Sequence, residues 1–244
     1  MPDISRQIFA YSGVLKPAPG GPGTGALIDY ALGLARSGAG GRQRLCYVPT
    51  AVGDLKEAVD FYAQAMEKRP QVEFSALRLF TQPSVPDVRG HLLSQDAILV
   101  EGGSVVNLMA VWRAHGLPPI LRECWETGVV LTGSSAGSLC WHLGGPTDSF
   151  SDALAPFTDG LGLVPFSNGV HDDLDDQPRR SVYREMVASG QLAAGYATED
   201  GVGLHYIGTE LHEAIGILPG KRAWRVDPDG AGGYAEQELV PRLV

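Results

Sequence analysis

Short apolar runs rich in Val, Ile and Leu alternate along the first half of the chain with segments whose apolar residues recur at helical spacing. The clearest helical segment carries Leu55, Val59, Tyr62 and Met66 on one face. The pattern predicts strands at Gln7–Gly13, Arg44–Pro49, Val72–Phe80, Ala97–Glu101 and Gly128–Thr132, and helices at Thr24–Ser37, Leu55–Arg69, Val105–His115 and Ile120–Thr127. Strands that alternate with helices pair in parallel and are covered on both faces. We therefore expect an α/β fold, a three-layer sandwich with a mostly parallel central sheet.

The pattern is less regular from about Gly144 onwards. It predicts a helix at Arg179–Ala188 and short strands at Leu161–Pro165, Gly195–Thr198, Val202–Ile207 and Glu213–Leu218. The acidic stretch His171–Arg180 has the composition of a solvated loop. Because no internal repeat and no Ser/Gly-rich linker divides the chain, we expect a single domain over residues 1–244.

Composition and charge narrow the class of protein. The 244 residues are 44% hydrophobic and carry a net charge of −9, which argues against a basic face for nucleic acid or for an anionic membrane. No apolar run approaches the roughly 18–20 residues of a membrane span, and residues 1–13 lack the apolar stretch of a signal peptide. Cys46, Cys124 and Cys140 are widely spaced without a CxxC pair. We expect reduced thiols in the cytoplasm, with neither a disulfide framework nor a metal site.

The strongest chemical signal is the segment Gly133–Gly137, which reads G-S-S-A-G directly after the apolar run Val129–Leu131. G-x-S-x-G between a strand and a helix is typical of the nucleophile elbow, a sharp turn that needs small flanking residues and exposes the serine hydroxyl. Ser135 is therefore the candidate nucleophile. An ordinary glycine-rich turn is the alternative, since the chain contains 32 glycines.

The strand predicted before the elbow ends in Glu101, Gly102 and Gly103. Because the carboxyl ends of parallel strands meet at one sheet edge, this turn is expected beside the elbow, where the backbone turns an N–H group towards an oxyanion. Gly102 and Gly103 are the candidate donors from the turn. The N–H of Ala136, the residue after the nucleophile, is the other. A simple strand-ending turn is the alternative interpretation.

A serine nucleophile needs a base, and the chain has six histidines. His171 is the best placed, because it lies in a polar loop after an apolar segment on the carboxyl side of Ser135. His142 is expected on the elbow helix, pointing away from the hydroxyl. His205 is expected within a strand and His212 in a turn.

The base needs a carboxylate that orients it. Asp200 ends a short predicted strand and is followed by a glycine, whereas Asp148 lies just beyond the elbow helix. Spacing alone leaves both residues as candidates.

Two weaker patterns point to other ligands. Residues 21–26 fit G-x-G-x-x-A after the first predicted strand, but Pro49 and Thr50 stand where a dinucleotide site expects an acid. A run of aspartates lacks the glycine and the closing glutamate of a calcium loop; it comprises Asp172, Asp173, Asp175 and Asp176. A turn and a solvated loop are the preferred interpretations, and we expect no cofactor.

Four segments, in the same order along the chain, resemble the peptidase E (dipeptidase E) family of serine peptidases. Residues 98–108 (ILVEGGSVVNL) are similar to the family's strand-GGN-helix segment, and residues 133–138 (GSSAGS) to its elbow. Residues 159–165 (DGLGLVP), which lead to His171, resemble its GLGL…H segment, and residues 196–204 (YATEDGVGL) resemble its late acidic strand turn. The resemblance implies a flavodoxin-like sandwich similar to the class I glutamine amidotransferases.

The resemblance also implies roles by position. It implies that Ser135 is the nucleophile, that His171 is the base and that Asp200 is the triad acid. Gly102 and Ala136 would be the oxyanion donors, and Asp148 falls on a second acidic position.

One position departs from the family pattern, because Ser104 stands where the family usually has Asn after Gly-Gly. We expect this change to relax the demand for an aspartyl substrate. Arg179 and Arg180 fall where relatives also have arginines, which makes them candidates for binding an anionic substrate group. Glu101 suits a substrate ammonium instead.

The leading hypothesis is a cytoplasmic serine exopeptidase, monomeric or homodimeric, that hydrolyses the N-terminal residue from dipeptides or short peptides. One alternative is an α/β-hydrolase esterase, in which Ser135 works with Asp148 or Asp200 and with His205 or His212. Another is a sandwich of this type that has lost catalysis and binds a ligand. An intact elbow, histidine and acid favour the peptidase.

Overall fold

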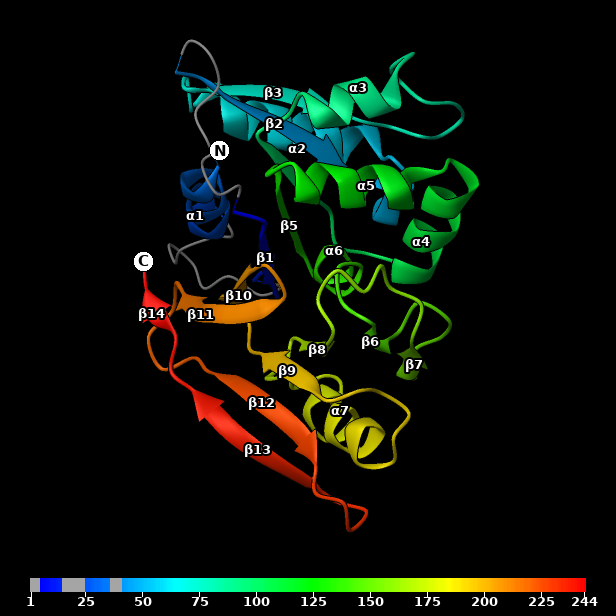
Figure 1. The fold of residues 1–244 in the computed structure, drawn as a ribbon, viewed down its shortest axis with the longest axis vertical. Coiled ribbons are helices and arrows are strands. Elements are labelled where there is room, and N and C mark those ends of the chain that lie inside the picture. Colours follow the sequence, from blue (N-terminus) through cyan, green and yellow to red (C-terminus); the bar gives the residue numbers. More distant parts are fainter. Residues whose placement is uncertain (1–4, 15–24, 36–40) are drawn as a thin grey trace.

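A computed structural model describes residues 5–14, 25–35 and 41–244 (Figure 1). Within these residues the larger sheet has eight strands in the order β14-β11-β10-β1-β5-β4-β2-β3. The five strands from β1 to β3 in this order are parallel. β10 pairs antiparallel with β1, and β11 pairs antiparallel with β10. The strands are β1 (Gln7–Tyr11), β2 (Gln43–Val48), β3 (Val72–Ala76), β4 (Ala97–Val100), β5 (Val130–Ser134), β10 (Val202–Ile207), β11 (Glu210–Gly216) and β14 (Arg242–Leu243).

A smaller sheet lies at the opposite end of the long axis from β2 and β3 (Figure 1). Its strands follow the order β13-β12-β9-β8, and a separate short ladder joins β6 to β7. The bounds are β6 (Gly145–Thr147), β7 (Ala155–Phe157), β8 (Ser167–Val170), β9 (Gly195–Thr198), β12 (Ala223–Pro228) and β13 (Tyr234–Leu239).

Helices cover both faces of the larger sheet. One face packs on α1 (Gly25–Leu34) and α2 (Lys56–Glu67). The other packs on α3 (Val88–Leu93), α4 (Val105–Ala114), α5 (Leu117–Glu126) and the short α6 (Ala136–Leu139). A 3-10 turn, η1 (Thr50–Val52), follows β2, and α7 (Arg179–Ala188) packs on the smaller sheet.

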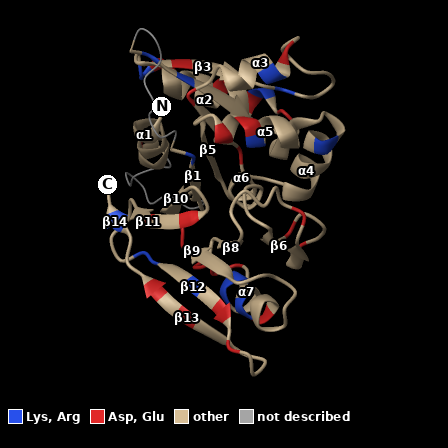
Figure 2. Ribbon diagram, in the orientation of Figure 1, with Lys and Arg blue, Asp and Glu red and all other residues tan. Residues whose placement is uncertain are grey.

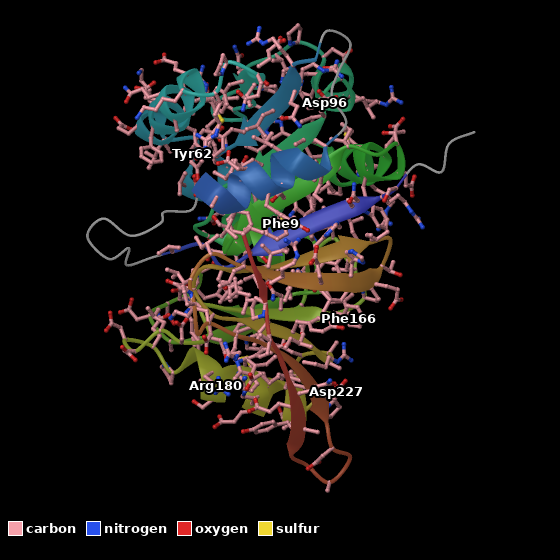
Figure 3. The ribbon with its side chains drawn as sticks, turned by 90° about the vertical axis from the view of Figure 1, so that its left-hand side faces the viewer. Phe9, Tyr62, Asp96, Phe166, Arg180 and Asp227 are labelled. Atoms are coloured by element: carbon pink, nitrogen blue, oxygen red, sulfur yellow. The ribbon has the colours of Figure 1, made fainter. Side chains whose placement is uncertain are left out.

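The alternation of side chains along β1 explains the two layers. Ile8 and Ala10 enter the core under α3–α6, whereas Phe9 and Tyr11 enter the core under α1 and α2. Phe9, labelled in Figure 3, lies 4.7 Å from Tyr30 of α1 between ring centroids. Because both faces are apolar, the strand is buried on both sides, as parallel sheets require.

The expected three-layer α/β fold is therefore confirmed, and most predicted elements lie within a few residues of their observed bounds. Cys46, Cys124 and Cys140 are buried, free thiols. The larger core contains residues from both sheets, such as Leu131 of β5 and Val170 of β8. The single domain over residues 1–244 stays a prediction. None of the helices in the described part of the chain is long and apolar enough to cross a bilayer.

The prediction of a strand at Leu161–Pro165 is wrong. The N–H groups of Leu161 and Leu163 donate to the carbonyls of Cys140 and Trp141, at 2.8 and 2.9 Å, so this segment folds back on the end of α6 instead of joining a sheet. The strand begins six residues later, as β8.

The structure differs from the predicted pattern at two further places, and part of that pattern lies outside the described residues. His212 lies in β11 and not in a turn. The C-terminal hairpin of β12 and β13 had no counterpart in the predicted pattern. Residues 1–4, most of the glycine-rich segment at 21–26 and both ends of the helix expected at Thr24–Ser37 lie outside the described residues.

Candidate active site

The predicted elbow forms at the carboxyl end of β5. Ser135 has φ 54° and ψ −112°, a strained combination for a residue with a side chain, and its N–H donates to the carbonyl of Tyr11 at 3.0 Å. The flanking glycines are required by packing: an added Cβ at Gly137 would lie 2.3 Å from the Val100 carbonyl oxygen, and one at Gly133 would lie 2.5 Å from that of Gly137. The end of the neighbouring strand β4 thus packs so closely on the turn that Gly137 has no room for a side chain.

A cavity of about 300 Å³ opens over the carboxyl ends of β1, β4 and β5. Its lining comprises Ser12, Gly13, Val14, Val52, Tyr62, Glu101, Gly102, Gly103, Ser134 and Ser135. The Gly-Gly turn reaches the elbow as expected, since a Cβ at Gly102 would lie 3.2 Å from the Ser135 Cβ. The candidate nucleophile and the turn therefore face the same small space.

His171 and Asp200 meet beside this cavity. The Nδ1 atom of His171 lies 2.5 Å from Asp200 Oδ1, and the histidine side chain is 2% exposed. The N–H of His171 donates to Ser12 Oγ at 3.0 Å, and the Ser12 hydroxyl in turn lies 2.8 Å from the Thr198 carbonyl oxygen. His171 Nε2 is buried and has no hydrogen-bond partner among the described residues. One ring nitrogen is thus held by a carboxylate while the other is available.

The second candidate acid lies elsewhere. Asp148 is exposed and accepts a hydrogen bond from Arg179 at 2.8 Å and another from Gln177 at 3.3 Å. The esterase histidine His205 is also occupied, since its ring nitrogens bond Tyr30 and Gln7. His171 and Asp200 therefore pair next to Ser12, which lines the cavity, whereas Asp148 and His205 are bonded elsewhere.

Glu101 is half-buried in the cavity wall and contacts its own turn. Its Oε1 accepts the N–H of Gly102 at 2.9 Å, and its Oε2 accepts the hydroxyl of Tyr47. Burial and the negative charge of Glu101 raise the pKa of Tyr62. Among the described residues no Lys, Arg or His forms an ion pair with Glu101. In the described part of the chain this carboxylate is thus held by neutral donors alone.

The Glu101 contact corrects one expectation. The N–H of Gly102 is not directed at an open site in this structure, because the adjacent carboxylate accepts it. Ala136 begins α6, so its N–H has no partner within the helix.

The residues expected to bind substrate through polar groups have roles within the fold. Ser104 caps α4, since its Oγ accepts the N–H of Asn107 at 3.2 Å. Arg179 is buried and pairs with Asp148. Arg180 lies over the Trp224 ring and pairs with Asp172 and Glu236. Arg179 and Arg180 are therefore engaged within the fold, and a role for them in binding an anionic substrate group stays a prediction.

Of the four aspartates after His171, Asp172 and Asp173 are bonded within the fold rather than solvated as the composition indicates, whereas Asp175 and Asp176 are exposed. Asp172 is buried and pairs with the buried Arg184 at 2.5 Å and with Arg180 at 3.1 Å. Arg184 also pairs with Glu236 at 2.7 Å, and Figure 2 shows the basic residues of α7 next to acidic residues of β13. Burial raises the pKa of Asp172 although two guanidinium groups lower it. The helix arginines thus anchor the residue that follows the candidate base.

Asp173 holds the candidate acid. Its Oδ1 accepts the N–H of Asp200 at 2.8 Å, and its carboxylate pairs with Lys221. The segment 171–173 therefore contains the candidate base, an aspartate that pairs with arginines of α7, and an aspartate that accepts the N–H of Asp200.

We expect Asp172→Asn to lower the free energy of unfolding by about 3 kcal/mol or more, because one partner of a buried ion pair is left without its counter-charge. Urea unfolding followed by circular dichroism measures the change. Asp175→Asn, at an exposed position of the same loop, is the matched control and should change little. Equal midpoints for the two variants would mean that the buried pair adds nothing to stability.

The fold and this geometry can be compared with known proteins. The model of peptidase family S51 matches residues 28–214. The chain belongs to peptidase family S51. It is 37% identical over 185 residues to the uncharacterized peptidase YgaJ of Bacillus subtilis (strain 168), an alignment that covers 75% of this chain and 77% of the relative.

Solved structures agree on the fold of this S51 peptidase. A putative peptidase E protein from Listeria monocytogenes EGD-e superposes with a TM-score of 0.60 at 18% identity, covering 88% of this chain and 100% of the other. A peptidase from an acI-B1 Actinobacterium gives 0.65 at 18% identity, covering 97% and 95%. The predicted family is confirmed, the chain is a peptidase, and the esterase alternative is not favoured.

Sequence reasoning missed several residues that shape the site of this S51 peptidase. Ser12 follows β1 at the same sheet edge as Glu101 and Ser135, and that position was the available signal. The spacing of Tyr62 indicates only one face of an amphipathic helix. Asp173 was read as a solvent-exposed acid, and nothing in its local pattern indicates a bond to the backbone of Asp200.

Proposed function

We propose that this S51 peptidase is a serine exopeptidase that releases the N-terminal residue from dipeptides and short peptides through a Ser135–His171–Asp200 triad. The observation that carries the proposal is the His171–Asp200 contact of 2.5 Å beside the cavity that contains Ser135. Asp200 accepts at Nδ1, so the proton of the neutral ring stays there and Nε2 keeps its lone pair. That lone pair is the base that a serine hydroxyl needs.

The reaction proceeds in two halves. His171 Nε2 takes the proton of Ser135 as Oγ attacks the peptide carbonyl, and the tetrahedral intermediate then collapses as the same proton passes to the leaving amine. Water attacks the acyl-enzyme with His171 again as base, which releases the N-terminal residue and restores Ser135. His171 must close on the hydroxyl when substrate binds, as catalytic hydrogen bonds commonly do.

Backbone N–H groups at the elbow and the Gly-Gly turn stabilise the oxyanion in this proposal. Ala136 supplies one group. Gly103 or Gly102 supplies the other, and for Gly102 this requires Glu101 to release the N–H that it accepts at 2.9 Å.

Glu101 supplies a reason for an exopeptidase rather than an endopeptidase. Its carboxylate lines the cavity, lies next to the turn that touches Ser135, and has no cationic partner in the described residues. A free α-ammonium is the substrate group that would compensate this charge. The cavity of about 300 Å³ also suits a short segment of peptide.

The test is Glu101→Gln, assayed on matched substrates with free and N-acetylated amino ends. The unaltered enzyme should cut free dipeptides or aminoacyl-nitroanilides of several residue types and cut the acetylated ones poorly. Because a hydrogen bond to a charged group contributes about 1.5–3 kcal/mol, Glu101→Gln should lower kcat/KM about 10- to 100-fold for free substrates. It should leave acetylated substrates almost unchanged.

Glu126→Gln, on the exposed side of α5, is the control and should match the unaltered enzyme. If acetylated substrates are cut as fast as free ones, the enzyme is not an aminopeptidase. If only Asp-Xaa substrates are cut, Ser104 has not relaxed the demand for aspartate. We also propose a cytoplasmic protein that acts as a monomer or homodimer.

A further inference from the structure

A β-bulge brings three metal-binding side chains together on the larger sheet, away from the candidate active site. In the pairing of β10 with β11, His205 lies opposite Glu213, whereas Tyr206 lies opposite Leu211. His212 is therefore the extra residue of the bulge, and a bulge re-aims the side chain of the residue that it inserts. One ligand atom from each of His205, His212 and Glu213 lies within 4.8 Å of the others.

The hydrogen bonds around His205 show which ring nitrogen carries the proton and which carries the lone pair. Gln7 Nε2 donates to the Leu34 carbonyl at 3.2 Å, which directs its Oε1 towards His205 Nε2 at 3.0 Å. His205 Nε2 must then carry the proton, so Nδ1 holds the lone pair. Outer partners fix metal-binding histidines in this way.

The Tyr30 hydroxyl contacts two hydrogen-bond acceptors at this cluster but has only one proton to donate. The Tyr30 hydroxyl lies 2.9 Å from His205 Nδ1 and 2.9 Å from Glu213 Oε1. Both are acceptors, but a phenol has a single proton, so one of the two contacts joins two lone pairs. A cation between these atoms relieves this conflict.

Arg242 supplies positive charge from the solvent side in the present structure. Its guanidinium bonds both carboxylate oxygens of Glu213, at 2.8 and 2.9 Å, and its side chain is 55% exposed. Exposed ion pairs of this kind contribute little to stability, so a divalent ion can displace Arg242 from Glu213.

We propose that His205, His212 and Glu213 form a binding site for a borderline divalent transition metal such as Zn²⁺. Two imidazoles and one carboxylate are a zinc ligand set, with metal distances of about 2.0–2.2 Å. His205 is buried, whereas His212 is exposed, and their ring centroids lie 5.3 Å apart. The ligands come from β10 and β11, so the ion ties these two strands together beside α1 and takes no part in peptide hydrolysis.

The test is zinc titration of untagged, EDTA-treated protein by calorimetry, with Co²⁺ absorption as a probe of coordination. We expect one site per chain and a cobalt spectrum typical of four-coordinate geometry. His212→Ala and Glu213→Gln should each weaken zinc binding at least about tenfold. Arg242→Ala should strengthen it, because a competing cation is removed.

His115→Ala is the matched control, since His115 is an exposed histidine at the end of α4, and it should bind zinc like the unaltered protein. Thermal melting of each metal-free variant checks that it folds, and exposed His212 is the variant least able to disturb the core. Absence of zinc binding, or affinity unchanged in both His212→Ala and Glu213→Gln, overturns the site. Weaker binding by Arg242→Ala also overturns it.

Discussion

Replacing Ser135 with alanine is expected to abolish peptide hydrolysis while leaving the fold intact. The side chain is half-exposed in the cavity, and the strained backbone of the elbow is held by Gly133, Gly137 and the Tyr11 carbonyl rather than by the hydroxyl. Removal of the nucleophile from a serine protease costs on the order of 10⁶ in kcat. Turnover of a free dipeptide and labelling by a fluorophosphonate measure the loss, and circular dichroism checks the fold.

Ser134→Ala is the matched control for this experiment, because Ser134 lines the same cavity and precedes the nucleophile. It should retain labelling and most of the turnover. If Ser135→Ala is still labelled or still cuts peptides at a comparable rate, the elbow is only structural and the nucleophile lies elsewhere.

Asp200→Asn is expected to lower kcat roughly 10⁴-fold, because an asparagine amide presents the wrong tautomer of His171 to the nucleophile. The contact of 2.5 Å to Nδ1 makes Asp200 the group that holds this ring, and Asp173 holds the Asp200 backbone. Steady-state assays on the same dipeptide, with thermal melting as a fold check, measure the effect.

Asp148→Asn is the matched control for the triad acid, since its carboxylate pairs with Arg179 and lies in the other acidic position of the family pattern. It should lose far less activity than Asp200→Asn. A larger loss in Asp148→Asn would transfer the role of triad acid to Asp148 and leave the His171–Asp200 contact as a structural pair.

Local pattern predicted the features that depend on neighbours in sequence. The strands at β1, β2, β4 and β5 follow from short apolar runs, and the elbow follows from small residues at fixed spacing, because each is decided within a few residues. Local pattern left His171 and both acids only as candidates, and the resemblance to peptidase E implied the roles of His171 and Asp200. The choice between Asp148 and Asp200 depends on a contact across 29 residues. Spacing carries no information about such a contact.

The predictions that failed depended on partners far along the chain. Asp172 reads as solvated until Arg184 and Glu236 surround it, and Leu161–Pro165 reads as a strand until its N–H groups reach the carbonyls at the end of α6. Arg179 and Arg180 likewise pair with Asp148, Asp172 and Glu236, contacts that the sequence does not indicate. In each case a tertiary partner overrides the composition of the segment.

The hydroxyl of Ser12, which lines the cavity with Ser135, joins the larger sheet to the smaller sheet that precedes His171. Ser12 follows β1 of the larger sheet and bonds both Thr198 of β9 and the backbone of His171, which follows β8. Proteins open in cooperative units with separate local stabilities. An opening of the smaller sheet would carry His171 away while the elbow stayed folded. With the proposed triad, we expect turnover to follow the local stability of that sheet and not that of the whole molecule.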